Sequence, residues 1–221
     1  MAMDAGIEVV VTSLAATPAW VRAALAVLSP DERARADRFV HGRDRRRFVM
    51  ARARLRQLIG ERLGVAPQSV QFGYGTYGKP SLATPRHDIR FNIAHSEDLA
   101  VYAFASGVEL GVDVERLRVI DDAARLVARF SPRERRAYES LPPGDRPVGF
   151  LNCWTRKEAF IKATGQGLSL PLDSFDVTIA PGKPAEILRV GTMRGAKCGW
   201  RLQSFIPAEG FVAALVHERM S

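Results

Sequence analysis

Apolar residues recur at the spacing of an amphipathic helix in two long stretches of the chain. In the first, RDRRRFVMARARLRQLIGERLG, they run from Phe48 to Ile59 while arginines occupy the other faces, and Gly64 provides a stop signal. The second, FLNCWTRKEAFIKATGQG, predicts a helix over 150–164 that closes at Gly165. Two long helices are therefore expected, and the first has a basic exterior.

Shorter helices are predicted from start signals. Ser29-Pro30 and Ser131-Pro132 each place a capping serine before a proline at the first helical position. A further helix is predicted over 121–130. One start signal thus precedes each of the two long helices.

Strand-like runs occupy much of the remaining chain. They lie at 7–11, 89–94, 99–105, 109–115, 175–179, 185–189, 200–205 and 211–216. Ser106-Gly107 is expected to be a tight turn, which would join the runs within 89–115 into a meander or hairpin array. The glycine- and proline-rich stretch after Gln71 is expected to be an irregular loop. The pattern predicts an α+β fold with antiparallel strands, and no strong sequence repeat is visible.

Composition narrows the class of protein. The chain has 221 residues and a net charge of +8, and no apolar run reaches the roughly 18 residues that a membrane span needs. Asp4 and Glu8 stand where a secretory signal would be positive, so the chain is expected to be cytoplasmic. Its cysteines, Cys153 and Cys198, are then expected to be reduced. The positive charge favours a polyanionic or acidic partner, or simply a soluble surface rich in arginine.

Candidate chemistry begins with the segment GVDVERL. The strand period of two puts Asp113 and Glu115 on one face, with Val112 and Val114 on the other face toward the core. Adjacent carboxylates repel each other, and a hard divalent cation such as Mg²⁺, which prefers oxygen ligands, would relieve that repulsion. An exposed strand face with two hydrated acids explains the same residues.

Two other polar groups also allow an ordinary and a functional interpretation. On the helix over 150–164, Thr155, Glu158 and Lys162 lie along one stripe. The Glu-Lys pair can be a surface pair worth about 0.2–0.5 kcal/mol, or it can face a site. His95, at the end of the strand FNIAHS, can donate to a phosphate or can be a structural hydrogen-bond partner. No nucleophile elbow, Walker loop or dinucleotide glycine pattern accompanies these groups.

The order and spacing of these motifs resemble the 4′-phosphopantetheinyl transferase superfamily. FNIAHS is followed by GVDVERL and then by WTRKEAFIKATGQGL. The flanking segments LSPDERARADRFVHGRDRRRF, YGKP and LSLPLDSFDV, together with the length, are similar to the long, monomeric class that activates peptide and polyketide synthetases. The likeness covers most of the chain and weakens after Val177.

The resemblance implies a fold and a reaction. The fold would consist of two similar α+β lobes with pseudo-twofold symmetry, residues 1–108 and residues 109–221, with coenzyme A bound in the cleft between them. The enzyme would transfer the 4′-phosphopantetheine group from coenzyme A to a serine of an apo acyl or peptidyl carrier protein and release 3′,5′-ADP. Its metal would be Mg²⁺, with Mn²⁺ possible. Because carrier proteins are generally acidic, the basic surface would speed their encounter.

The resemblance also implies a set of site residues. The metal ligands would be Asp113, Glu115 and Glu158, and the catalytic residues would be Glu158 and Lys162. Contacts to coenzyme A would come from Arg47, Lys79, His95, Lys157 and Lys162, with Glu134 near the cleft. Glu158 would accept the proton of the carrier serine, directly or through water, while Lys162 stabilises the phosphoryl oxygens. A metal ligand is a weak base, so another proton acceptor, including water, stays open.

Two other classes of function stay open from the sequence. A nucleic-acid-binding module would use the arginine helix, but it would leave the three acids unexplained. A family member without catalytic activity would still bind coenzyme A or the carrier, but the full acidic set argues against it. We therefore expect a monomeric, cytoplasmic transferase that has no nucleic-acid or membrane partner.

Overall fold

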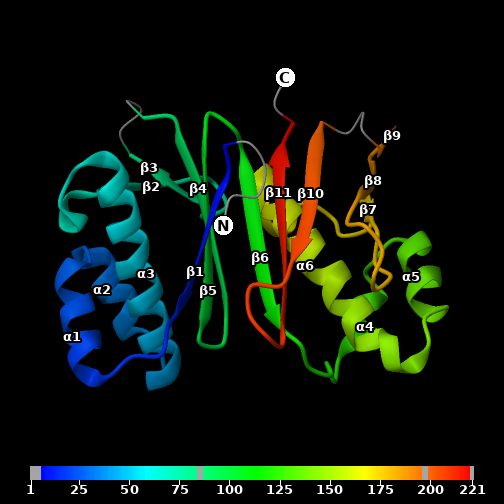
Figure 1. Ribbon diagram of the computed structural model, residues 1–221, viewed down its shortest axis with the longest axis horizontal. Helices are drawn as coiled ribbons and strands as arrows, with labels where there is room; N and C mark the ends of the chain where they lie inside the picture. The colour runs from blue at the N-terminus through cyan, green and yellow to red at the C-terminus, as the bar shows by residue number, and fades with distance from the viewer. Residues whose placement is uncertain (1–5, 84–86, 196–198, 220–221) are drawn as a thin grey trace.

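Two three-stranded antiparallel sheets stand side by side in the middle of the molecule, with helices on their outer sides (Figure 1). The computed structural model describes residues 6–83, 87–195 and 199–219. The first sheet has the strand order β1-β5-β4, and the second has the order β10-β11-β6. The predicted α+β class with antiparallel strands is confirmed.

The first half of the chain builds the first sheet and the helices that cover it. The sheet contains β1 (Glu8–Ser13), β4 (Ile89–Ser96) and β5 (Leu99–Ser106), and a separate hairpin contains β2 (Phe72–Tyr74) and β3 (Pro80–Leu82). The helices are α1 (Pro18–Val27), α2 (Pro30–Asp37) and α3 (Gly42–Leu63), followed by a 3₁₀ turn at Pro67–Ser69. Helix α3 is the predicted arginine helix, and Gly64 ends it in the left-handed conformation.

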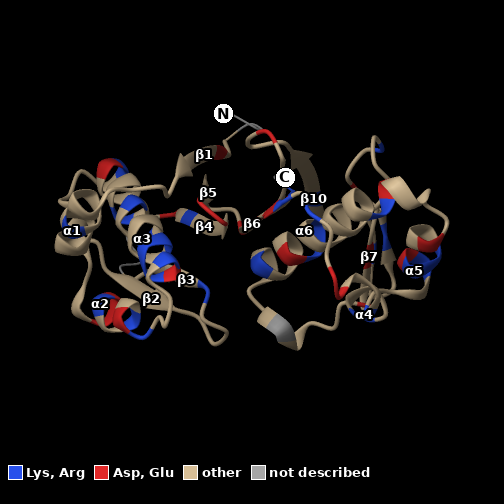
Figure 2. Ribbon diagram, turned by 90° about the horizontal axis from the view of Figure 1, so that it is seen from below, with Lys and Arg blue, Asp and Glu red and all other residues tan. Residues whose placement is uncertain are grey.

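The second half builds the second sheet and a smaller sheet beside it. The main strands are β6 (Leu110–Arg116), β10 (Trp200–Phe205) and β11 (Phe211–Glu218), and the smaller sheet contains β7 (Phe175–Val177), β8 (Ile187–Val190) and β9 (Met193–Arg194). The helices are α4 (Ala123–Val127), α5 (Pro132–Glu139) and α6 (Arg146–Thr164), with 3₁₀ turns at Pro143–Asp145 and Gly167–Ser169. Seen from below, α3 and α6 lie to either side of the adjoining strands β4 and β6 (Figure 2).

The structure corrects several local predictions. The stretch after Gln71 contains the β2–β3 hairpin, in which Phe72 pairs with Leu82. Helix α1 was not predicted, although Thr17 caps it by accepting the backbone N–H of Trp20. Helix α6 begins at Arg146, four residues before its predicted start, because a proline is compatible with its first turn.

The run predicted at 109–115 does not continue the hairpin array. Strand β4 pairs with β5 as expected, but β6 pairs with β11 in the other sheet. Gly107, at a φ of 67°, leads the chain out of the first sheet. Val112 and Val114 then pack with apolar side chains from both sheets, so the two sheets share this part of the core. None of the helices in the described ranges is long and apolar enough to cross a membrane.

Both halves follow the same order of elements. Each starts with a strand, continues through a short helix that begins with Ser-Pro and a long helix, and ends with a hairpin. In each half the first strand pairs antiparallel with the last strand, as β1 does with β5 and β6 does with β11. The repeat lies in the topology and in buried contacts, which explains why it is hard to see in the sequence.

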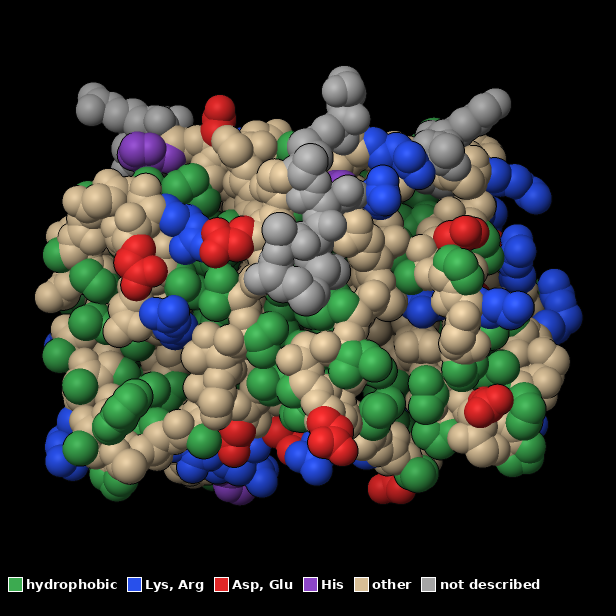
Figure 3. Space-filling view, in the orientation of Figure 1, with side chains coloured by type: hydrophobic (Ala, Val, Ile, Leu, Met, Phe, Trp, Pro, Cys, Tyr) green, Lys and Arg blue, Asp and Glu red, His purple; other side chains and the backbone are tan. Residues whose placement is uncertain are grey.

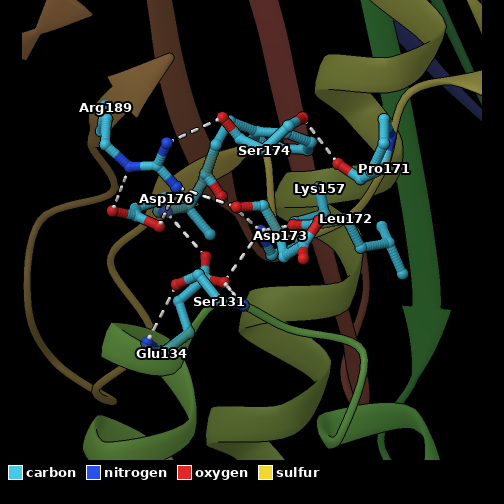
Figure 4. Close-up of polar contacts among 11 residues, drawn as sticks. Ser131, Glu134, Lys157, Pro171, Leu172, Asp173, Ser174, Asp176 and Arg189 are labelled. Atoms are coloured by element: carbon cyan, nitrogen blue, oxygen red, sulfur yellow. Dashed lines mark hydrogen bonds and ion pairs between the residues drawn. The ribbon is translucent and has the colours of Figure 1, made fainter. Parts of the chain in front are cut away.

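A buried ion pair occupies corresponding places in the two halves. In the second half, Lys157 Nζ of α6 lies 2.9 Å from Glu134 of α5, and both side chains are at most 1% exposed (Figure 4). In the first half, Arg56 Nε of α3 donates to Glu32 of α2 at 2.6 Å. Each glutamate also accepts the backbone N–H of the serine that caps its own helix. The pair thus joins a short helix to a long one in both halves.

Candidate active site

A cavity of about 240 Å³ lies where α6 faces the β3–β4 region of the first half. Eleven residues line it: Tyr77, Gly78, Lys79, Pro80, Asn92, Ile93, Glu158, Ile161, Lys162, Gly165 and Gly167. Its walls therefore combine apolar side chains with two lysines and one carboxylate. Such a mixture suits a ligand that has both a flat apolar part and a negatively charged part.

Gly111 allows β6 to lie against α6 more closely than another residue would permit. A Cβ atom at this position would stand less than 3.0 Å from backbone atoms of Ala159 and Ala163. The close approach places Lys162 Nζ 2.6 Å from Asp113 Oδ1. The strand and the helix thereby bring an acid and a base together beside the cavity.

Three carboxylates influence one another at this point. Burial raises the pKa of Asp113 to about 6, with smaller contributions from Glu158 and Glu115, although the Lys162 ammonium opposes the shift. Burial also raises the pKa of Glu158, and the charge of Glu115 adds to that increase. The side chains of Asp113, Glu115 and Glu158 are thus close enough for their charges to interact. Their mutual repulsion is the electrostatic condition that a bound cation would relieve.

The carboxylates are not arranged as a ready-made cage. Across the described ranges, no group of three His, Cys, Asp or Glu side chains lies in an arrangement that could hold a metal ion. Asp113 Oδ1 is bound to Lys162, whereas Asp113 Oδ2 is buried and has no hydrogen-bond partner among the described residues. Glu115 Oε2 accepts the Ser96 hydroxyl at 2.8 Å. The unpartnered oxygen of Asp113 and the repulsion between the acids are both compatible with a bound cation. The carboxylate side chains would have to rotate to coordinate it.

The basic side of the site comes from β4 and α3. His95 lies near both Lys162 and Arg47, and its pKa is lowered first by partial withdrawal from water and then by those two positive charges. Arg47 Nε donates to Asp98 at 2.9 Å, and Arg46 donates to the same carboxylate at 2.9 Å. His95, Arg47 and Lys162 therefore belong to one positively charged region.

Lys79 joins the two halves at the cavity wall. Its ammonium group lies 2.7 Å from Glu109 and donates to the backbone oxygens of Leu110 and Ala163 at 3.1 and 3.0 Å. The three N–H groups of Lys79 thus have protein partners, while its side chain lines the cavity. In this structure Lys79 holds the first half against β6 and α6.

Two residues implied by the resemblance lie elsewhere. Lys157 is fully buried, and its Nζ donates to the backbone oxygens of Leu172 and Phe175 besides pairing with Glu134 (Figure 4). Lys157 is therefore not among the residues that line the cavity, and its expected contact with coenzyme A stays a prediction. Glu134 is 1% exposed and accepts the Val177 N–H at 2.8 Å, so it belongs to the interior of the second half.

Sequence reasoning missed the residues that support the site. Asp98 holds Arg46 and Arg47, and its position in a tight turn directly after FNIAHS was the available signal. Gly111 precedes the acidic pair and reads as an ordinary strand glycine until the helix is placed against it. Cys153 is buried, and burial raises the pKa of its thiol, in agreement with a reduced structural cysteine. The predicted role of Cys198 lies outside the described residues.

Family models match nearly the whole chain. One described as the 4′-phosphopantetheinyl transferase superfamily covers residues 109–216. Another, described as 4′-phosphopantetheinyl transferase, N-terminal, covers residues 15–107.

Individual relatives carry the same description. The 4′-phosphopantetheinyl transferase HetI of Nostoc sp. is 37% identical over 86% of this chain and 78% of its own length. The 4′-phosphopantetheinyl transferase Sfp of Bacillus subtilis is 32% identical over 70% of this chain and 68% of its own length. A solved ACPS–CoA complex from Chronobacterium ammoniagenes is 20% identical, covers 52% of this chain and 98% of that chain, and has a TM-score of 0.39.

Proposed function

The chain belongs to the 4′-phosphopantetheinyl transferase superfamily, and from that membership we propose that the cavity beside α6 binds coenzyme A, the donor of the group that is transferred to a carrier protein. The chain is an enzyme of the long, Sfp-like class. It moves the 4′-phosphopantetheine group of coenzyme A to carrier proteins. Its family membership favours this function over the nucleic-acid-binding alternative.

Coenzyme A would lie with its nucleotide in the cavity and its phosphates toward the cations. The apolar walls, which include Tyr77 and Ile161, suit an adenine ring. Lys162, His95 and Arg47 form the positive region next to it, which suits phosphate oxygens. Lys79 supports this site as a wall residue whose ammonium is already held by Glu109.

Asp113, Glu115 and Glu158 would hold Mg²⁺, or Mn²⁺ in its place. The observation that carries this assignment is Asp113, whose Oδ1 binds the Lys162 ammonium while its Oδ2 is buried without a partner among the described residues. Carboxylate oxygens are the ligands that these hard cations prefer. When bound, the metal supplies positive charge that offsets the charge of the pyrophosphate and of the leaving group.

Glu158 and Lys162 would act on the reacting groups. Glu158 accepts the proton of the carrier serine, directly or through water, because its carboxylate lies at the cavity wall beside Lys162. A carboxylate that binds a metal is a weak base, so water is the alternative proton acceptor. The serine oxygen forms a bond to the β-phosphorus of coenzyme A, the bond from that phosphorus to the bridging oxygen breaks, and 3′,5′-ADP leaves. Lys162 moves from Asp113 to the phosphoryl oxygens, where its charge stabilises the transition state.

The carrier would dock against the basic face of the enzyme. Lys and Arg side chains lie at the lower edge of the molecule, below α3, with Asp and Glu side chains beside them (Figure 3). We take the carrier to be acidic, so its association rate should fall as salt screens the attraction. Residues 1–108 and 109–221 would form the two lobes, and a single chain supplies both sides of the site, which supports a monomeric enzyme.

The test of this function is the mass of an apo carrier protein after incubation with the enzyme, coenzyme A and Mg²⁺. We expect the carrier to gain one phosphopantetheine group, and chelation with EDTA to stop the reaction. Glu158→Gln should slow transfer by about 100-fold or more, since general-base catalysis contributes about 10²–10⁴-fold. Glu61→Gln, an exposed carboxylate change on α3, serves as the matched control.

No mass gain across several apo carriers that an active control enzyme modifies would contradict the proposed function. Asp113→Ala tests the metal site separately, and we expect it to lose both transfer and metal binding. Wild-type turnover in Asp113→Ala would overturn the metal assignment but not the enzyme class.

A further inference from the structure

Strands β4 and β6 run side by side as neighbouring edges of two different sheets. Side chains of β4 bind the backbone of β6 at two points. Asn92 Oδ1 accepts the Val112 N–H at 2.9 Å, and Ser96 Oγ accepts the Arg116 N–H at 3.1 Å. Each pair is separated by 20 residues, so the two strands run parallel and in a fixed register.

These contacts take the place of a backbone ladder. The other edge of β6 pairs with β11, so amides on the near edge would lack a strand partner. Because Asn92 and Ser96 are buried, an unpaired amide here would be costly. Asn92 and Ser96 therefore hold the second sheet against the first, and we call this pair of side chains the seam.

Ser96 makes a second contact that Asn92 does not. A hydroxyl group has one hydrogen to donate and two lone pairs to accept with. Since a backbone N–H can only donate, the Ser96 oxygen must accept from Arg116, and its hydrogen is free for Glu115 Oε2 at 2.8 Å. One hydroxyl thus fixes both the backbone of β6 and the carboxylate of Glu115.

We propose that Ser96 is a positioning residue for the transfer reaction, which holds Glu115 in the orientation needed for metal binding. This inference rests on the proposed function, because it takes Glu115 as a metal ligand. His95 and Ser96 are successive residues of one strand, so their side chains point to opposite sides. The strand FNIAHS thereby ties the coenzyme A side of the site to its acidic side.

The test measures metal binding directly, by the EPR signal of free Mn²⁺ titrated with the enzyme in the presence of coenzyme A. We expect Ser96→Ala to weaken Mn²⁺ binding by about 10-fold or more, the usual effect of removing a hydrogen bond to a metal ligand. Ser96→Thr keeps the hydroxyl and should bind Mn²⁺ nearly as the wild type does. Ser106→Ala, at the exposed end of β5, is the matched control and should have no effect.

Amide hydrogen exchange provides a second measurement that needs neither metal nor activity. Ser96→Ala should accelerate exchange of the Arg116 amide, while Asn92→Ala should accelerate exchange of the Val112 amide. Only the first variant should weaken Mn²⁺ binding strongly, because only Ser96 contacts Glu115.

The outcomes separate this inference from the function on which it rests. A wild-type enzyme that modifies carriers, with Ser96→Ala binding Mn²⁺ as tightly as the wild type, would overturn the positioning role alone. An unchanged Arg116 exchange rate in Ser96→Ala would overturn the seam. A wild-type chain that neither binds Mn²⁺ nor modifies any carrier would instead overturn the proposed function, and the positioning role with it.

Discussion

The two halves of the molecule share one layout but place opposite charges beside the cavity. Helix α3 of the first half carries Arg47, whereas α6 of the second half carries Glu158. The first strands also differ, because β6 (LGVDVER) carries Asp113 and Glu115 toward its end, whereas the corresponding end of β1 (EVVVTS) carries no charged residue. A repeated scaffold thus provides a basic wall from the first half and, from the second half, an acidic wall that also carries Lys162.

The comparison separates residues that hold the scaffold from residues that do chemistry. In both long helices a buried cation pairs with the glutamate of the preceding helix, as Arg56 does with Glu32 and Lys157 does with Glu134. The next residue is Gln57 in α3 and Glu158 in α6. Because successive helical residues point about 100° apart at 3.6 residues per turn, the cation can be buried while its neighbour faces the cavity. The neighbour can therefore vary between the halves without disturbing the buried pair.

Removing the buried cation should have the largest effect on stability, and the effect should be larger in the second half. We expect Lys157→Met to lower the free energy of unfolding by about 3–5 kcal/mol, because it leaves the buried Glu134 without its cation. Arg56→Met should cost less, because Arg52 Nε still lies 3.3 Å from Glu32. Urea unfolding followed by circular dichroism measures the loss. Arg45→Met, which breaks the exposed pair with Asp37, should cost at most about 1 kcal/mol.

The same variants test whether Lys157 has a direct role in binding. A folded Lys157→Met enzyme with wild-type stability but reduced affinity for coenzyme A would contradict the scaffold role. It would also break the equivalence with Arg56.

Gly111→Ala should have the next largest effect, and it is specific to the second half. The added methyl group would press on the backbone of α6, so we expect a loss of about 3 kcal/mol, at the upper end of what overpacking costs. The displaced helix should also lower the transfer rate, because Glu158 and Lys162 move with it. Gly144→Ala, where a Cβ meets no atom within 4 Å, is the control for thermal unfolding and for activity. Equal melting temperatures for the two variants would show that β6 and α6 are not in such close contact.

Local elements were largely predictable from the sequence, whereas the pairing of distant segments was not. Ser-Pro starts and apolar spacing, which are local signals, predicted helices α2, α3 and α5. The partner of β6 is β11, nearly 100 residues later, and no local pattern specifies a partner at that separation. Predicting a hairpin across Ser106-Gly107 was reasonable for the turn but wrong for the sheet.

The same distinction between local patterns and distant contacts applies to the site. Spacing placed Asp113 and Glu115 on one face of a strand, and the resemblance added Glu158, Lys162, His95 and Arg47. The burial of Lys157 could not be seen in a motif, because lysine is rarely buried and its partner Glu134 lies on another helix. The supporting contact from Ser96 was hidden in a strand whose partner was unknown.

The smallest effect concerns the basic wall. Asp98 receives hydrogen bonds from Arg46 and Arg47, so Asp98→Asn should leave Arg47 less ordered and weaken coenzyme A binding. We expect the Kd to rise only about two- to fivefold, because the Asp98 side chain is 41% exposed and water weakens such pairs. The turnover rate at saturating coenzyme A should not change. Asp37→Asn, which removes the partner of Arg45, is the matched control.

The direction of the Asp98 pKa shift determines how the difference in Kd between Asp98→Asn and the wild type depends on pH. The hydrogen bond from Arg47 lowers the pKa of Asp98 in the folded protein. The Asp98 carboxylate is therefore ionised at every pH above the ordinary pKa of an aspartate, and it becomes protonated only as the pH falls through the lowered pKa. Titration calorimetry with coenzyme A should therefore give the same ratio of Kd values for Asp98→Asn and wild type between about pH 6 and pH 9. A ratio that falls to one within this window, or a lower turnover rate with an unchanged Kd, would mean that Asp98 acts on the acidic wall and not on the basic one.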